Sequence, residues 1–462
     1  MRILLVIYDN ESIIQWFPQG MAYIAATLLK FGHDVEIYEQ DIHHYPEEHL
    51  TQKLDNEHYD VVGLSFIGGY YEYKKAISIS NSINESKQRP YYILGGFGPS
   101  PAPHFFLKKM GADAIVRGEG ENTIIDLLNH LEEKKDLKNV LGIAYREGDK
   151  TFLNADRPLI EDVDTIPMPA YHLFNIPHYR LLRMPNCDKT DFIMPVLSGR
   201  GCTFTCNFCY RMDKGFRGRS NEAIIEEIRY LQKNHGVTYI AFSDELLMSS
   251  IGRTMSLCKA MIDAKLNIKW DCNGRLNYAK PKVLKLMKEA GCVFINYGIE
   301  AYDDQILKNM DKVLTTKQIE RGIVDTLNEG LSPGYNIIFG NIDETKETLM
   351  KGVEFLLKYD DGAQMRTIRP VTPYPGSPLY HLALKEGLID GIEDFYENKH
   401  LNSDLLTCNF TKLSDEEFYL ALMEANEMLL DNYQDRVRVN TKKQLEELYL
   451  KKDTTFRGFR QT

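Results

Sequence analysis

Short apolar runs alternate with amphipathic stretches along the first third of the chain. Strands are predicted at 2–8, 34–39, 61–67, 91–96 and 113–118. Helices are predicted between them at 20–31, 72–84, 103–110 and 121–133. Apolar strands separated by helices are typical of a parallel sheet covered on both faces, which binds ligands at the carboxyl ends of its strands. This pattern predicts a doubly wound, Rossmann-like α/β domain over residues 1–135.

A second series of alternating strands and helices begins near residue 192. Its strands are predicted at 192–198, 238–243, 268–273, 293–300, 334–340 and 364–370. Its helices are predicted at 221–234, 252–264, 282–290, 317–329 and 346–359. Strand and helix units in this number fit a partial (β/α)6 barrel of TIM type, whose chemistry is expected where the strands end. We assign this barrel to residues 191–385.

The remaining segments have a different character. Residues 136–190 contain a hairpin-like piece at 142–152 and a proline-bearing stretch at 166–169, which indicates a linker. Residues 386–462 are charged and helical in pattern, which predicts a small helical C-terminal domain.

Composition narrows the class of protein. The chain has 462 residues, of which 43% are hydrophobic and 26% charged, as in ordinary soluble globular proteins. No apolar run approaches the roughly 20 residues needed to cross a membrane, and no leader precedes the first strand, so a cytoplasmic protein is expected. The net charge of −11 argues against nucleic acid as the main partner, since phosphate binding favours a basic face.

The eight cysteines fall into two groups. Cys187, Cys258, Cys272, Cys292 and Cys408 are scattered, and buried thiols are expected there. Cys202, Cys206 and Cys209 form a C-x3-C-x2-C motif directly after the first predicted barrel strand. Thiolates bind iron–sulfur clusters, and three of them leave one iron of a [4Fe–4S] cluster open for substrate. A zinc site would need further ligands that no second cysteine pair supplies, and a disulfide is disfavoured by the odd number of clustered thiols.

This motif at the end of a first barrel strand resembles that of the radical S-adenosylmethionine (SAM) superfamily. The resemblance implies that the open iron chelates SAM, that reduction cleaves SAM to a 5′-deoxyadenosyl radical, and that Tyr210 lies near the adenine. Further SAM-site candidates stand at the strand ends: Asp244, Glu245, Arg275, Glu300 and Gly340. Arg275 would neutralise the SAM carboxylate, and Gly340 would permit close approach. Their alternatives are a surface ion pair for Arg275 and a helix N-terminal carboxylate for Asp244 or Glu245. Glu300, if buried, needs a partner.

Segments across residues 1–380 also resemble the subfamily that carries an N-terminal cobalamin-binding domain. They lie at 18–26, 118–121, 200–202, 298–300, 340–345 and 374–377. This subfamily includes the anaerobic magnesium-protoporphyrin cyclase, hopanoid methylases and antibiotic methyltransferases. The resemblance implies cobalamin as a further cofactor.

The expected cobalamin cradle has no cobalt ligand. The nearest match to a D-x-H-x-x-G loop, at 41–46, lacks the glycine, so His43 and His44 are expected to be surface residues. Gly98 stands where the family commonly has histidine. The residues expected to line the cradle are Ser65, Gly68, Gly69, Gly95, Gly96, Gly98, Gly118, Glu119 and Gly120. The alternative is that these are merely tight turns between strands and helices.

The leading functional hypothesis is therefore cobalamin-dependent methyl transfer to an unactivated carbon or phosphorus centre. The alternatives are a radical SAM enzyme that cyclises, rearranges or couples its substrate, and a non-enzymatic binding or regulatory protein. The expected partners are a small-molecule or peptide substrate and an electron donor of the flavodoxin or ferredoxin type. Arg369, near the end of the last strand, is expected to point into the barrel.

Overall fold

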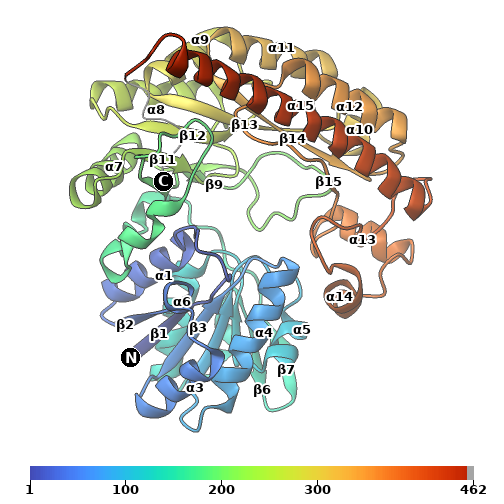
Figure 1. Ribbon diagram of the computed structural model, residues 1–462. Coiled ribbons are helices and arrows are strands. Elements are labelled where there is room, and N and C mark those ends of the chain that lie inside the picture. The colour runs from blue at the N-terminus through green and yellow to red at the C-terminus, as the bar shows by residue number, and fades with distance from the viewer. Residues whose placement is uncertain (455–462) are drawn as a thin grey trace.

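The computed structural model describes residues 1–454, which form two large sheets with their covering helices and one short two-stranded ladder (Figure 1). The first sheet has the order β2-β1-β3-β4-β5-β6-β7. Its parallel strands are β1 (Arg2–Ile7), β2 (Asp34–Glu39), β3 (Val61–Ser65), β4 (Tyr91–Gly95) and β5 (Ala114–Val116). Its helices are α1 (Gln19–Lys30), α2 (Gln40–His43), α3 (Glu47–Asn56), α4 (Tyr70–Glu85), α5 (Pro103–Met110) and α6 (Gly120–Glu132). The doubly wound fold is confirmed.

The expected hairpin is part of this first sheet. β6 (Ile143–Glu147) pairs antiparallel with β5, and β7 (Lys150–Leu153) pairs with β6. The sheet therefore continues into the segment that the sequence predicts as a linker. The rest of that segment carries the short 3-10 helices η1 (Leu137–Asn139), η2 (Val163–Thr165), η3 (Tyr171–Leu173) and η4 (Ile176–Leu181).

The second sheet is an open partial barrel of parallel strands in the order β15-β14-β13-β12-β11-β8. Its strands are β8 (Ile193–Val196), β11 (Tyr239–Phe242), β12 (Lys269–Gly274), β13 (Cys292–Glu300), β14 (Ser332–Phe339) and β15 (Arg369–Pro370). Its helices are α7 (Asn221–His235), α8 (Ile251–Asp263), α9 (Pro281–Glu289), α10 (Asp304–Asn309), α11 (Thr316–Asn328) and α12 (Lys346–Tyr359). The predicted partial barrel is confirmed.

The last barrel strand is much shorter than the predicted 364–370, because Arg366 makes contacts outside a strand ladder. Arg366 is buried, and it pairs with Asp360 at 3.0 Å and donates to the carbonyl of Pro333 at 2.9 Å. Arg369 is exposed and pairs with Asp404 at 2.8 Å. Arg369 is thus held by the C-terminal region, and no contact places it inside the barrel.

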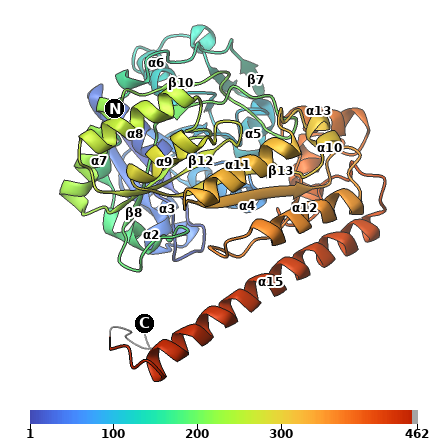
Figure 2. The same ribbon diagram turned by 90° about the horizontal axis from the view of Figure 1, so that it is seen from above.

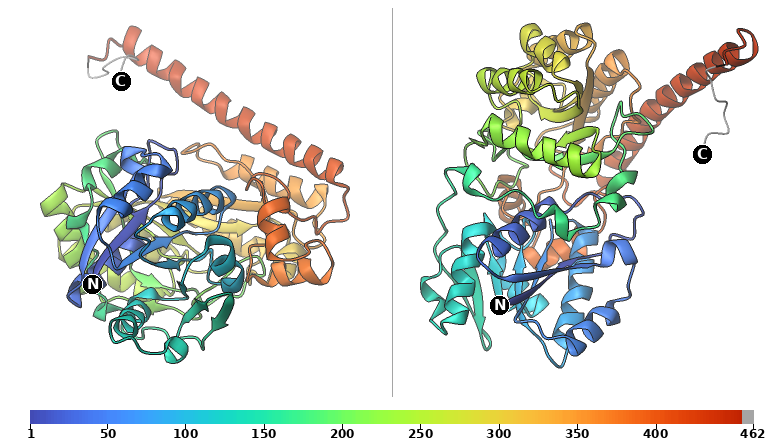
Figure 3. Two further views of the ribbon diagram at one scale, coloured as in Figure 1. Left: turned by 90° about the horizontal axis from the view of Figure 1, so that it is seen from below. Right: turned by 90° about the vertical axis from the view of Figure 1, so that its left-hand side faces the viewer.

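The C-terminal part divides between the two halves of the molecule. It consists of α13 (Pro378–Lys385), α14 (Ile392–Asp394), the π-helical turn η5 (Phe395–Lys399) and α15 (Asp415–Tyr449). Phe395 and Tyr396 belong to the core of the N-terminal domain, where Tyr396 stacks on Tyr73 at 4.5 Å. Phe418 of α15 instead belongs to the barrel core and stacks on Phe339 at 4.6 Å. Beyond that contact, α15 extends away from the body (Figures 2 and 3).

The N-terminal domain and the barrel share a hydrophobic core. Phe17, which precedes α1, stacks on Tyr171 at 5.2 Å and meets Tyr179 edge-on at 5.4 Å. These rings belong to the same apolar cluster as the barrel strands. The segment between the domains is therefore packed rather than extended. None of the helices in residues 1–454 combines the length and the apolar character needed to cross a membrane.

His400 packs on Phe395, which belongs to the core of the N-terminal domain, and its burial makes the free energy of unfolding depend on pH. It is fully buried against Phe395, and burial lowers its pKa to about 4, compared with about 6.5 in an unfolded chain. The folded state favours the neutral ring, so its contribution is intact above about pH 6.5 and is lost as the pH falls toward 4, by up to roughly 3 kcal/mol. We expect His400→Phe to lose less stability than the parent chain over this range, as measured by denaturant unfolding at several pH values.

The exposed His172 provides the control, because His172→Phe should keep the parent's pH dependence. Identical pH dependence of unfolding in the parent chain and in His400→Phe would contradict the assignment.

Candidate functional site

The clustered cysteines lie on one loop whose ends pair as a short antiparallel ladder. The paired strands are β9 (Gly199–Arg200) and β10 (Arg217–Gly218). Gly201 follows the ladder with φ 83°, and a Cβ there would lie 2.4 Å from the carbonyl oxygen of Gly215. Only glycine fits this turn. The ladder and the turn therefore fix the direction in which the chain enters residues 201–216, the cluster loop.

The three thiols of the cluster loop are free. Burial, with smaller contributions from the nearby thiols of Cys206 and Cys202, raises the pKa of Cys209 to about 12. Burial also raises the pKa of Cys206, while the positive charges of Lys312 and Arg275 lower it. A coordinated metal deprotonates such thiols outright, because its charge outweighs the cost of burial.

This donor set fits an iron–sulfur cluster by its chemistry. Among residues 1–454, no three His, Cys, Asp or Glu side chains are arranged closely enough to form a metal site as they stand. The cluster loop nevertheless brings three free thiols within electrostatic range of one another, with two cations beside them. Three thiolates are the protein ligands that a [4Fe–4S] cluster with one open iron requires.

Arg275, predicted to contact SAM, lies against the cluster loop. Its guanidinium is centred 3.3 Å from the ring centroid of Phe204, between the first two cysteines, and acts electrostatically on Cys206. One of its nitrogens donates to the carbonyl of Lys312, while its buried Nε has no hydrogen-bond partner. Arg275 thus combines a structural contact with a free donor close to the cysteines.

Glu300 is buried at the end of β13, and its partner is Lys312. Lys312 Nζ donates to Glu300 Oε1 at 2.8 Å, and both side chains are almost wholly buried. Glu300 has φ 68°, which is uncommon for a residue with a side chain, and such strain is concentrated at functional sites. The pair lies close enough to act on Cys206 and Cys209. Lys312 is not among the residues predicted from the sequence, because it follows Glu300 outside any strand.

Asp244 and Glu245, which follow β11, have different environments. Asp244 is fully buried, and its carboxylate accepts from the backbone N–H of Ser198 at 2.9 Å and from its hydroxyl at 2.8 Å. Burial raises the pKa of Asp244 to about 6. Asp244 thus joins the ends of β8 and β11 behind the cluster loop. Glu245 is exposed, although loss of solvent around its carboxyl group raises its pKa. Of the two carboxylates, that of Glu245 is therefore the one available to a ligand.

Gly340 and Tyr210 each pack against another part of the protein. A Cβ on Gly340, which has φ 103°, would lie 2.8 Å from Cε2 of Phe418, so the glycine makes room for α15. Tyr210 packs edge-on against Phe97 of the N-terminal domain, with ring centroids 6.3 Å apart, and against Gly376. Tyr210 therefore stands at the interface between the two halves.

Several glycines of the expected cobalamin cradle are explained by loop packing. A Cβ on Gly68 would lie 3.0 Å from Cα of Gly98 and 3.0 Å from the hydroxyl of Tyr396. A Cβ on Gly98 would lie 2.5 Å from the ring of Phe66, so a histidine there would force that ring to move. Gly96 is restricted in the same way, since a Cβ there would lie 2.5 Å from the carbonyl oxygen of Phe66 and 2.7 Å from the hydroxyl of Ser65. At Gly69 and Gly120 the nearest atoms belong to the movable ends of the Glu72 and Ile24 side chains.

Gly118 is different, since it has φ 71° and no atom within 4 Å of its Cβ position, and Gly95 meets only an ordinary contact at 3.8 Å. These two glycines leave space for a ligand at the carboxyl edge of the sheet.

The carboxyl edge also exposes apolar side chains to an unusual degree. Ile13 after β1 and Ile67 after β3 are each 71% exposed, and Trp16 is 52% exposed. Exposed apolar residues gathered on one edge mark a binding surface. A large flat ring system such as a corrin would cover them, so this edge fits cobalamin.

Glu119 does not face this edge freely, contrary to the expectation that it lines the cradle. Its buried carboxylate accepts from Arg200 at 2.9 Å and from Arg217 at 2.8 Å, both at the base of the cluster loop. Glu121 accepts from Arg200 at 2.6 Å. The acidic residues at the start of α6 therefore bind the barrel rather than a ligand.

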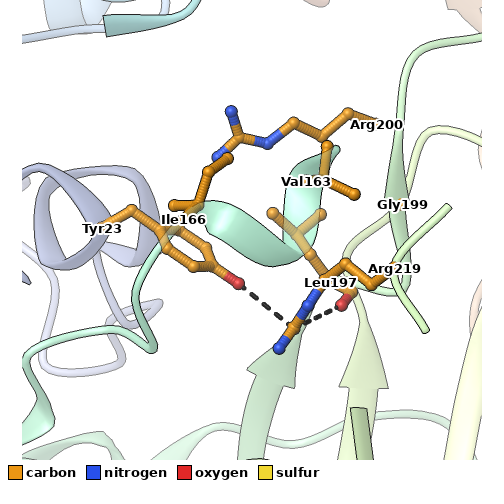
Figure 4. Close-up of a pocket in the computed structure, with 7 residues that line it drawn as sticks. All are labelled: Tyr23, Val163, Ile166, Leu197, Gly199, Arg200 and Arg219. Atoms are coloured by element: carbon orange, nitrogen blue, oxygen red, sulfur yellow. Dashed lines mark hydrogen bonds between the residues drawn. The ribbon is translucent and has the colours of Figure 1, made fainter. Parts of the chain in front are cut away.

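Small cavities do not mark the site. One pocket between the two halves, lined by Tyr23, Leu197 and Arg219 among others, has a volume of only about 10 Å³, barely enough for a water molecule (Figure 4). A groove of about 500 Å³ lies on the outer face of the barrel between α10, α11 and α12. Its lining includes none of the predicted site residues.

The ion pair beside the cysteines gives a direct test of this geometry. Lys312→Met leaves the buried Glu300 carboxylate without a counter-charge, which should lower the free energy of unfolding by about 3–5 kcal/mol. The double variant with Glu300→Gln should regain most of that loss. Denaturant unfolding of the cofactor-free chain measures both.

Lys351→Met is the matched control, because the Lys351 pair with Asp303 is partly exposed and should contribute less than about 1 kcal/mol. Equal losses from Lys312→Met and Lys351→Met would refute the buried pair.

Comparison with known proteins identifies both halves. Residues 11–128 match the B12 binding domain family, and residues 196–356 match the Radical SAM superfamily. An uncharacterised methyltransferase of Pyrococcus horikoshii is 32% identical over 403 residues, which cover 84% of this chain and 84% of that protein. The anaerobic magnesium-protoporphyrin IX monomethyl ester cyclase of Rubrivivax gelatinosus is 28% identical over 79% of this chain and 66% of its own length.

A solved structure has the same fold over nearly the whole chain. The radical SAM methyltransferase TsrM from Kitasatospora setae, with cobalamin and a [4Fe–4S] cluster bound, superposes with a TM-score of 0.74 at 16% identity. The match covers 92% of this chain and 90% of that one. From these matches, the chain belongs to the radical SAM superfamily, in the group whose barrel follows an N-terminal B12-binding domain.

Proposed function

We propose that this protein is a cobalamin-dependent methyltransferase that acts on an unactivated carbon or phosphorus centre. The proposal is carried by one observation: the loop with three free thiols is bound by salt bridges to the start of α6, at the carboxyl edge of the B12-binding sheet. Family membership implies a [4Fe–4S] cluster, SAM and cobalamin as cofactors. When bound, these groups supply a 5′-deoxyadenosyl radical and a methyl group.

The side chains around the cluster loop have distinct tasks in this proposal. Cys202, Cys206 and Cys209 are the cluster ligands. Arg275, with its unpartnered Nε, offers a donor to the SAM carboxylate. Glu300 is the acceptor for the SAM amino group or ribose hydroxyls, and Lys312 holds its charge in place. Glu245 is a second carboxylate open to ligand.

Other residues position these groups and keep water away. Asp244 fixes the start of the cluster loop through Ser198. Gly95, Gly118 and the exposed apolar residues Ile13 and Ile67 form the surface for cobalamin. A ring system on that surface would exclude water from the space in front of the cysteines, and this protects radical chemistry. Tyr210, at the same interface, is the aromatic residue that we propose to contact the adenine.

The partners follow from the same chemistry. Reduction of the cluster needs an electron donor, and we propose one of the flavodoxin or ferredoxin type. The substrate is a small molecule or a peptide. Free thiols persist in a reducing compartment, so we propose a cytoplasmic location.

A second candidate is radical cyclisation without methyl transfer, because a magnesium-protoporphyrin cyclase is among the relatives. The two reactions differ in their products. Methyl transfer from SAM gives S-adenosylhomocysteine as well as 5′-deoxyadenosine, whereas cyclisation gives only the latter.

Anaerobic reconstitution tests the proposal through cofactor content. The purified chain, supplied with iron, sulfide and cobalamin, should bind about four irons and one cobalamin, and should form S-adenosylhomocysteine and 5′-deoxyadenosine from SAM under reduction. Cys206→Ala should lose most of the iron and both products. Cys258→Ala, which removes a buried thiol outside the motif, should keep them.

Four irons without cobalamin, after growth with ample cobalamin, would rule out the methyltransferase and leave the cyclase. Iron that survives replacement of all three motif cysteines would rule out both.

A further inference from the structure

The base of the cluster loop is the place where the position of the cysteines is set. Arg200 and Arg217 are direct partners in the ladder that closes the loop. Arg200 is followed by Gly201 and then by Cys202, so a displacement of Arg200 is transmitted to the first cysteine. The turn at Gly201 is closely packed, since a Cβ there would lie 2.4 Å from the carbonyl oxygen of Gly215.

Both arginines reach across to the N-terminal domain. Arg200 donates to Glu119 at 2.9 Å and to Glu121 at 2.6 Å. Arg217 donates to Glu119 at 2.8 Å and to the carbonyl of Ile160 at 2.6 Å. The backbone N–H of Ile160 in turn donates to Glu119 at 2.7 Å. One carboxylate thus receives two guanidinium groups and one amide.

These charges are removed from solvent. The glutamate side chains are each 7% exposed, and Arg200 and Arg217 are 17% and 14% exposed. Buried ion pairs differ from surface pairs in that losing one partner leaves an uncompensated charge. Planar guanidinium groups also impose direction on the carboxylates they bind. The salt bridges of Arg200 and Arg217 therefore fix the orientation of the cluster loop relative to the start of α6, in addition to attracting the two.

Further contacts hold the base of the cluster loop, some of them with side chains of α1 and one within the loop. The guanidinium of Arg200 lies over the ring of Tyr23, 5.5 Å from its centroid, and Arg219 donates to the hydroxyl of Tyr23 (Figure 4). Ser243, at the end of β11, donates to Gln19 at 2.6 Å. Asp213, on the cluster loop itself, accepts from Arg217 at 2.8 Å.

We propose that Arg200, Arg217, Glu119 and Glu121, the interdomain clamp, are positioning residues that hold the cluster loop at one distance from the B12-binding domain. This inference rests on the proposed function, because a fixed spacing matters to a reaction that uses groups from both halves. Reacting groups that are misplaced by about 1 Å lose on the order of 100-fold in rate. The clamp acts through Gly201 and Cys202 and touches no reacting atom.

The test uses the holoenzyme and measures distance rather than turnover. A reduced [4Fe–4S] cluster and cob(II)alamin are both paramagnetic, so pulsed dipolar EPR reports the spacing between them. The double variant Glu119→Gln, Glu121→Gln keeps the size of the clamp and removes its negative charge. Arg217→Lys keeps the positive charge and removes the planar fork. Asp360→Asn is the matched control, since it breaks the equally buried pair with Arg366 inside the barrel.

We expect one narrow distance population in the parent holoenzyme and in Asp360→Asn. The double variant should show a shifted mean distance and loss of the single population, with iron and cobalamin content unchanged. Arg217→Lys should show a smaller shift in the same direction. A double variant with full cofactor content and the parent's distance distribution would overturn the proposal. If the double variant does not fold, Glu121→Gln alone takes its place, and the same two outcomes decide.

Failure of the proposed function has a different signature. A parent chain that binds iron without cobalamin removes the methyltransferase assignment but leaves the clamp testable by amide hydrogen exchange in the cofactor-free chain. Faster exchange across residues 199–219 in Glu121→Gln, with no change in Asp360→Asn, supports the clamp. Unchanged exchange across that segment overturns it.

Discussion

The salt bridges of Arg200 and Arg217 with Glu119 join the B12-binding domain to the two-stranded ladder at the base of the cluster loop. The chain has a partial barrel that is open at its edges and a doubly wound sheet with exposed apolar residues at its carboxyl edge. Neither half is chemically complete by itself. The cysteines belong to the barrel, and the surface suited to cobalamin belongs to the other sheet, so the function depends on how these halves are held together. Phe17, Tyr171 and the C-terminal segment around Tyr396 add apolar packing to that ionic contact.

Charge around the cysteines follows a consistent pattern. Arg275 and Lys312 bring positive charge to a place where the sulfur atoms are otherwise disfavoured as thiolates by burial. Glu300, which has a left-handed backbone conformation, compensates the charge of Lys312. Because buried charges need partners, the stability of this region and its ability to accept a charged cofactor are determined by the same few side chains.

Much of the fold could be predicted from the sequence, because buried parallel strands appear as short apolar runs. The runs that correspond to β1 to β5, β8 and β11 to β14 are strong signals of this kind. β15 was overestimated, because the apolar and polar pattern around residue 366 does not reveal that Arg366 is drawn to Asp360. The division of the C-terminal part between two cores could not be predicted from the sequence either. Tyr396 and Phe418 are both aromatic, but Tyr396 packs in the N-terminal domain and Phe418 in the barrel.

The site shows the same limit. The spacing of Cys202, Cys206 and Cys209 predicts the cluster because all three ligands come from one loop. The partners of Glu119 and Glu300 come from other segments, and no local pattern announces them. Gly340 was assigned to ligand approach, whereas Phe418, which lies far along the chain, accounts for it.

Three cysteines that hold a [4Fe–4S] cluster with one open iron leave that iron free to bind SAM. The EPR spectrum of the reduced, reconstituted chain, recorded with and without SAM, tests it most directly. We expect SAM to change the g values of the cluster signal, because its amino and carboxylate groups bind the open iron. A fully loaded cluster whose spectrum stays the same at saturating SAM would contradict the claim.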